Sequence, residues 1–194
     1  IIFGCYAGFL YSVDLNSGTL NWKLFVGGAV KCTAVQCFGL IFVGSHDRKL
    51  FVVGNTPGQA QFMKLLNNLL SQSALAMSLE ALVAGVKAGL DPDVMMDVIN
   101  AGSGRNTATD DKIPRTVLTR NFDFGFPISG ACKDTGLAIE ECQSMGLPMH
   151  VGSAAHQLWK FAYNQGAGKR DMTTLVTYLA AMAGVEVRGR AARK

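Results

Sequence analysis

The chain has 194 residues, of which 49% are hydrophobic and 16% are charged. This composition excludes an intrinsically disordered chain and supplies enough apolar side chains for one domain together with a smaller segment. The net charge is only +4, and the basic residues are dispersed apart from a cluster between positions 188 and 194. We therefore expect no nucleic-acid partner. The low charged fraction indicates that another subunit or domain covers part of the apolar surface.

The sequence also gives expectations about membranes, metals and compartment. No uninterrupted apolar run reaches the roughly 18 residues that span a bilayer, and no signal peptide opens the chain, so a cytoplasmic protein without membrane contact is expected. The five cysteines form no CxxC pair, and the three histidines lack zinc-ligand spacing with them. We expect reduced, buried cysteines in a reducing compartment and no metal site.

Residues 1–54 have the residue pattern of short β-strands. Phe9–Leu15 combines aromatic and β-branched residues, the turn residues Asn16, Ser17 and Gly18 follow, and the pattern resumes from Leu20 to Val26. A small antiparallel β segment is predicted here.

This β segment also repeats itself. A shift of 40 residues places Ile1 on Ile41 and Leu10 on Leu50, and such a period is typical of β-propeller blades. The segment resembles the repeat of the quinoprotein (PQQ-type) propellers, whose signature is matched by Asp14, Leu15, Gly18 and Trp22. One blade cannot close a ring. For function we therefore prefer the interpretation as a simple antiparallel sheet, and no quinone site is inferred.

The pattern changes at Asn55, where helices begin. Thr56 as N-cap, Pro57 at the first helical position and Gln59 form the start of a helix. Apolar residues then keep near-helical spacing up to Gly89, which predicts a helix of about 30 residues and roughly 45 Å. Asp91-Pro92 predicts the start of a second helix, ending at Gly102.

Further helices are expected near residues 110–119, 130–145, 148–164 and 171–183. The predicted fold class is α+β and mainly α. The predicted domains are an antiparallel β segment over 1–54 and an all-helical domain, built on one long helix, over 55–194.

Three polar residues interrupt the apolar pattern of the long helix. Lys64, Asn67 and Asn68 are three and four residues apart, so they project from neighbouring positions of one helix face. An ammonium group there can transfer a proton, and a carboxamide can fix an oxygen-bearing substrate. Spacing alone leaves open that this is only the solvated face of the helix.

Ordered motifs strengthen the functional interpretation. Gly58 and the Lys64–Asn68 pattern come first, followed by Phe126, Lys133-Asp134 and then Gly166-x-Gly168-x-x-Asp171. This segment, about 140 residues long, resembles the C-terminal domain of the β-hydroxyacid dehydrogenases, which include the 3-hydroxyisobutyrate and 6-phosphogluconate enzymes. Lysine at position 64 favours the alcohol dehydrogenases over the related imine reductases.

The resemblance implies roles for individual residues. Lys64 would be the catalytic general acid and base on the substrate hydroxyl, and Asn68 with Asn67 would bind the substrate, a small hydroxy acid. Lys133 would lie near the nicotinamide side of NAD or NADP, and Phe126 and Asp134 would also bind the cofactor. Gly130 and Thr135 depart from the family pattern, which commonly has larger apolar residues there, so the shape of the cofactor contact is expected to differ.

The family's nucleotide-binding fingerprint, Gly-x-Gly-x-x-Gly after a first strand, does not occur, and neither does its Ser-Gly-Gly substrate motif. We therefore expect the C-terminal catalytic and dimerisation domain of an NAD(P)-dependent 3-hydroxyacid dehydrogenase, inactive and without tight cofactor binding when alone, and homodimeric. The alternative is a non-catalytic helical oligomerisation scaffold, fused naturally or artificially to a propeller fragment. We favour an artificial chimera because the two halves resemble unrelated families.

Overall fold

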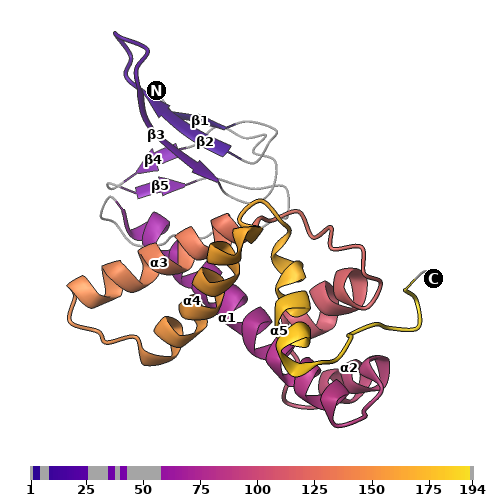
Figure 1. The fold of residues 1–194 in the computed structure, drawn as a ribbon. Coiled ribbons are helices and arrows are strands. Elements are labelled where there is room, and N and C mark those ends of the chain that lie inside the picture. The colour runs from indigo at the N-terminus through magenta and orange to yellow at the C-terminus, as the bar shows by residue number, and fades with distance from the viewer. Residues whose placement is uncertain (1, 5–8, 26–34, 38–39, 43–57, 193–194) are drawn as a thin grey trace. The chain divides into compact units, whose positions relative to one another are not determined.

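The computed structural model describes residues 2–4, 9–25, 35–37, 40–42 and 58–192. The fold is α+β and mainly α, as predicted (Figure 1). The chain divides into two compact units, Ile1–Lys64 and Leu65–Lys194. The predicted domain boundary between residues 54 and 55 lies outside the described residues and stays a prediction.

The first unit contains short antiparallel strands. Strands β1 (Ile2–Gly4), β2 (Phe9–Val13) and β3 (Leu20–Phe25) form a sheet in that order, and β4 (Val35–Cys37) pairs with β5 (Leu40–Phe42). Strands β2 and β3 confirm the two strands that were predicted over residues 9–15 and 20–26.

The predicted turn between β2 and β3 is built around Asp14. Its Oδ1 accepts hydrogen bonds from the backbone N–H groups of Asn16, at 3.0 Å, and Ser17, at 2.8 Å. Hydrogen bonds from Ser17 and Asn16 lower the pKa of Asp14. The following Gly18 has φ +69°, which a glycine adopts without steric cost. The local sequence therefore determines this hairpin.

The long helix α1 (Gln59–Lys87) begins two residues later than predicted. Gly58 has φ +96°, outside the helical region, and its carbonyl accepts the first helical hydrogen bond from Phe62 at 2.8 Å. Thr56 and Pro57 lie outside the described residues. The helix ends as predicted before Gly89, whose φ is +90°.

No membrane span is predicted from the sequence, because polar residues interrupt every apolar run. By length and composition alone, however, helix α1 could cross a membrane. Its side chains favour a different interpretation. Leu75, Leu79 and Leu82, at spacings of four and three residues, are fully buried among the other helices. This buried stripe is typical of the core helix of a globular domain.

The remaining helices surround α1 in the second unit (Figure 1). They are α2 (Pro92–Ala101), the π-helix η1 (Ala108–Val117), α3 (Ile128–Ser144), α4 (His150–Ala162), the π-helical turn η2 (Tyr163–Ala167), the 3-10 turn η3 (Met172–Thr174) and α5 (Leu175–Ala183). They confirm the predicted helical stretches. Asp91 caps α2 as predicted, accepting from the N–H groups of Asp93 and Val94.

Two apolar clusters hold this unit together. The larger one joins the second half of α1 to η1, α4 and α5 and includes the fully buried Trp159. The smaller one consists of Leu65, Leu69 and Ala138, and it packs the first half of α1 against α3. The smaller cluster fixes the polar face of α1 beside α3, where the candidate site lies.

Candidate functional site

The predicted polar residues of α1 differ in their exposure. The side chains of Lys64 and Asn68 are half-buried, whereas Asn67 is exposed. Asn68 lies between the buried Leu65 and Leu69, so its carboxamide is held at the edge of the smaller apolar cluster. Of the two predicted asparagines, Asn68 therefore has the more constrained position.

A buried carboxylate on α3 holds Asn68. Asp134 is 2% exposed, and its Oδ2 accepts a hydrogen bond from Asn68 Nδ2 at 2.7 Å. Its Oδ1 lies 2.8 Å from Nζ of Lys133, whose side chain is 64% exposed. The carboxylate only accepts hydrogen bonds, so the NH₂ group of Asn68 must face it and the amide oxygen must point elsewhere. Asp134 thus orients Asn68 and links it to Lys133.

The beginning of α3 is fixed by the loop that precedes η3. The N–H groups of Ile128 and Ser129, in the first turn of α3, donate to the carbonyls of Arg170 and Gly168 at 2.9 Å each. The carboxylate of Asp171 accepts from the N–H of Gly125 at 2.7 Å. The predicted motif at positions 166–171 therefore acts structurally, because it satisfies helix-terminal donors that have no partner inside the helix.

The two departures from the family pattern have local explanations. The ring of Phe126 lies against Gly130, where a Cβ would come within 2.8 Å of the ring atom Cζ. A larger residue at 130 would therefore displace Phe126, one of the predicted cofactor contacts. Phe126 itself is half-buried and packs against the larger apolar cluster.

Thr135 is fully buried beside α4. Its hydroxyl lies 2.8 Å from both the carbonyl of Ala131 and Nδ1 of His156. A consistent assignment is that the hydroxyl donates to the carbonyl and accepts from the imidazole N–H. Burial, followed by the charge of Lys160, lowers the pKa of His156, which favours this neutral form. The polar residue at 135 is thus matched by a polar partner on α4.

Sequence reasoning did not single out Lys112. This lysine of η1 is 6% exposed, and its Nζ donates to Ser71 Oγ at 2.7 Å. It also lies 5.3 Å from the centre of the Phe124 ring. Burial lowers its pKa. Ser71 is one turn beyond Asn68 on α1, so the buried ammonium adjoins the predicted site. Lys112 follows Asp110 and Asp111 near the start of η1, where a lysine is usually solvated. Nothing in the sequence therefore indicates that it is buried.

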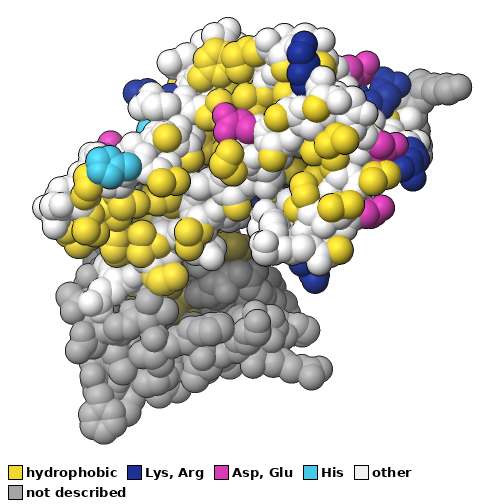
Figure 2. Space-filling model, turned by 90° about the horizontal axis from the view of Figure 1, so that it is seen from below, with side chains coloured by type: hydrophobic (Ala, Val, Ile, Leu, Met, Phe, Trp, Pro, Cys, Tyr) yellow, Lys and Arg dark blue, Asp and Glu magenta, His cyan; other side chains and the backbone are white. Residues whose placement is uncertain are grey.

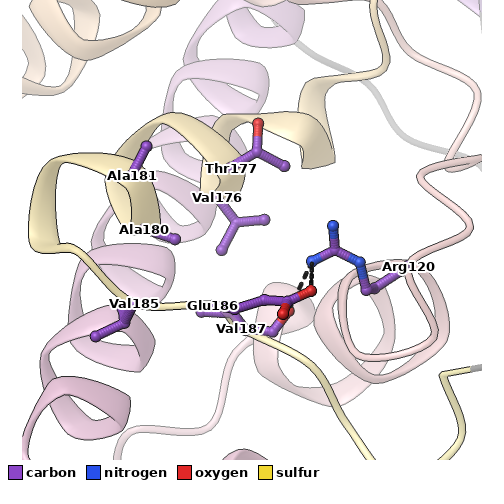
Figure 3. Close-up of a pocket in the computed structure, with 8 residues that line it drawn as sticks. All are labelled: Arg120, Val176, Thr177, Ala180, Ala181, Val185, Glu186 and Val187. Atoms are coloured by element: carbon purple, nitrogen blue, oxygen red, sulfur yellow. Dashed lines mark hydrogen bonds and ion pairs between the residues drawn. The ribbon is translucent and has the colours of Figure 1, made fainter. Parts of the chain in front are cut away.

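None of the predicted site residues lines the groove beside α5 (Figure 3). Arg120 borders this groove and is bound to Glu186, at 3.3 Å, and to the carbonyl of Val187, at 3.1 Å. The guanidinium therefore fastens the C-terminal segment. Among the residues that the structure describes, no three His, Cys, Asp or Glu side chains cluster as metal ligands.

Residues 58–179 match the family described as "NAD-binding of NADP-dependent 3-hydroxyisobutyrate dehydrogenase". The chain belongs to this family. It is 34% identical to 2-(hydroxymethyl)glutarate dehydrogenase of Eubacterium barkeri over 142 residues, which are 73% of this chain and 47% of that enzyme. The chain thus spans about half the length of this curated relative. The family match begins at Gly58, so it leaves the propeller resemblance of residues 1–54 a prediction.

Solved structures agree with this assignment. A 3-hydroxyisobutyrate dehydrogenase from Salmonella typhimurium has a TM-score of 0.61 at 25% identity, covering 65% of this chain and 44% of that one. A structure described as Psf3 in complex with NADP+ and 2-OPP has a TM-score of 0.57 at 25% identity, with the same two coverages. The helical unit therefore has the fold of the matching part of these structures.

Proposed function

We propose that the chain carries the substrate-binding and proton-transferring domain of an NAD(P)-dependent 3-hydroxyacid dehydrogenase. The observation that supports this most is that Asp134 accepts a hydrogen bond from Asn68 and forms an ion pair with Lys133, and so joins a predicted substrate residue to a predicted cofactor residue. A solvated helix face has no need for a buried carboxylate, because burying a charge is costly unless it is paired. Here the carboxylate is paired on both oxygens.

The proposed reaction oxidises the substrate alcohol to an aldehyde. Lys64, in its neutral form, takes the hydroxyl proton, and the carbon–oxygen single bond becomes a carbonyl as hydride leaves the carbon. A bound nicotinamide cofactor would supply the acceptor for that hydride. Asn68, whose orientation is fixed by Asp134, binds the substrate oxygen and holds it near Lys64, which is one helical turn away. In aldehyde reduction Lys64 returns the proton.

The residues of α3 fit the nicotinamide end of such a cofactor. Lys133 has an ammonium anchored to Asp134 and a side chain open to solvent, so it can face a second domain. Asp134, being buried, would support Lys133 and Asn68 rather than touch the cofactor itself. Phe126 would act through its packing at the start of α3. Holding the rest of the dinucleotide requires a nucleotide-binding domain, and residues 1–54 are proposed to be an antiparallel segment without that role.

The proposal is tested with two proteins. One is the 194-residue chain, and the other is residues 55–194 joined to the dinucleotide-binding domain of a relative. The joined protein is expected to reduce NAD or NADP in the presence of 3-hydroxyisobutyrate or a related hydroxy acid, and the chain alone is expected to show no turnover. A folded joined protein that binds the cofactor yet oxidises no hydroxy acid would contradict the proposed function.

The second candidate function, an oligomerisation scaffold, is favoured by an exposed apolar stripe on α1. Leu70 is 70% exposed and Met77 is 61% exposed, and Ala74, Ala81 and Ala84 continue the stripe at spacings of three and four residues. Apolar side chains cover much of one face of the helical unit (Figure 2). This pattern is typical of paired helices. We propose that the chain forms a homodimer through this stripe, which is compatible with both functions.

A further inference from the structure

A buried lysine lies next to the proposed site without an ion-pair partner among the described residues. The ammonium of Lys112 has three donors, and the structure gives it one acceptor, Ser71 Oγ at 2.7 Å, and the face of Phe124. The adjacent Asp111 attracts it electrostatically, but both carboxylate oxygens of Asp111 bind the guanidinium of Arg115, and no ion pair between Asp111 and Lys112 forms in the described residues. A lysine that is only 6% exposed normally has a counter-charge close to its ammonium.

The position of this ammonium relative to α1 identifies what could supply the counter-charge. Ser71 follows Asn68 by three residues and Lys64 by seven, so the three side chains lie within one face of the helix. Along the axis, Ser71 is roughly 4.5 Å from Asn68, because each residue rises about 1.5 Å.

We propose that Lys112 binds a carboxylate of the substrate and so selects hydroxy acids over neutral alcohols. This inference rests on the proposed function. A hydroxyl group held at Lys64 and Asn68 places a carboxylate two or more carbons away within reach of Ser71. The carboxylate could be the one that defines a 3-hydroxy acid, or a second one in a dicarboxylic hydroxy acid. Either carboxylate would accept a further hydrogen bond from the ammonium of Lys112 and neutralise its buried charge.

A purely structural role for Lys112 and a role in substrate binding predict opposite effects of its replacement on stability. If Lys112 served the fold, its replacement by methionine would destabilise the protein, because a stabilising contact would be lost. If it serves substrate binding, the same replacement removes a buried charge and leaves the fold as stable or more stable. The stem of lysine and the side chain of methionine have similar length, so packing is largely conserved. Stability and binding therefore separate the two roles.

The test is a titration of the 194-residue chain followed by amide chemical shifts, with three probes: 3-hydroxyisobutyrate, its neutral amide and 3-hydroxyglutarate. The hydroxy acid is expected to shift the amides near Ser71 and Lys112 and to bind about tenfold more tightly than the neutral amide, as one charge-assisted hydrogen bond allows. Lys112→Met should abolish this preference. Lys160→Met, which changes an exposed lysine of α4, should retain it.

The probes distinguish the two carboxylates. If Lys112→Met loses the preference for 3-hydroxyisobutyrate over its amide, Lys112 binds the carboxylate that defines the 3-hydroxy acid. If the variant loses only the extra affinity for 3-hydroxyglutarate, Lys112 binds the second carboxylate. Lys112→Gln, which keeps a hydrogen-bond donor for Ser71, serves as the second neutral variant if the methionine variant does not fold. A neutral variant that keeps both the acid-over-amide preference and the extra affinity for 3-hydroxyglutarate overturns the inference. It does so without affecting the proposed function, which depends on Lys64.

Discussion

Replacement of Asp134 by alanine should destabilise the helical unit. The carboxylate is 2% exposed and accepts a hydrogen bond from Asn68 at 2.7 Å, so its removal leaves a half-buried amide without that acceptor. A hydrogen bond to a charged group contributes about 1.5–3 kcal/mol. The contact with Lys133 adds less, about 0–1 kcal/mol, because that lysine is 64% exposed. We expect Asp134→Ala to lower the free energy of unfolding by about 1.5–4 kcal/mol.

The measurement is urea unfolding followed by circular dichroism at pH 7. Asp111→Ala is the matched control, because Asp111 forms an exposed ion pair with Arg115 and should lose about 0–1 kcal/mol. Asp134→Asn should fall between the two variants, since an amide oxygen can still accept from Asn68 while the ion pair with Lys133 is lost. Equal, small losses for Asp134→Ala and Asp111→Ala would refute the reasoning and make Asp134 an unimportant residue.

Three further predictions concern α1 and η1. In the joined enzyme, Asn68→Ala should raise KM for the hydroxy acid more than Lys64→Ala does, and steady-state kinetics with equal KM values for both variants would contradict this. Sedimentation should show a dimer at micromolar concentration that Leu70→Glu converts to monomer, whereas a monomeric unaltered chain would exclude the stripe as an interface. Burial lowers the pKa of Lys112 in the folded chain below the ordinary 10.5 of the unfolded chain. Between the folded and the unfolded pKa, the unfolded chain therefore binds more protons than the folded chain. The unaltered chain should therefore gain stability relative to Lys112→Met as pH rises toward 10.5, and parallel pH profiles in urea unfolding would argue against a strained buried ammonium.

The sequence predicted the helical half well because its signals are local. Asp91 was predicted to cap α2 and does so with two backbone hydrogen bonds. Gly89 was predicted to end α1 and has the positive φ of such an end. The start of α1 was misplaced by two residues, because the sequence does not show that Gly58 would leave the helical region. The capping residues therefore predicted the start of α2 and the end of α1 correctly, but not the start of α1.

The candidate site was only partly predictable, because its key contacts join distant residues. Spacing places Lys64 and Asn68 on one face, but the hydrogen bond from Asn68 to Asp134 spans 66 residues. The same holds for Lys112 and Ser71, which are 41 residues apart. Helical periodicity shows which face a residue occupies and gives no indication of the element packed against it. Asp134 was accordingly predicted as a cofactor contact, whereas its burial favours a positioning role.

The central claim is that Lys64 transfers the substrate proton, and its most direct test is the turnover of the joined enzyme carrying Lys64→Ala. General acid–base groups contribute about 10²–10⁴-fold, so kcat should fall at least about a hundredfold. Lys87→Ala, at the far end of the same helix, should leave kcat unchanged, because that lysine only donates to the carbonyl of Ala183. A Lys64→Ala enzyme that keeps most of the kcat of the unaltered enzyme would contradict the account and leave α1 with a solvated polar face.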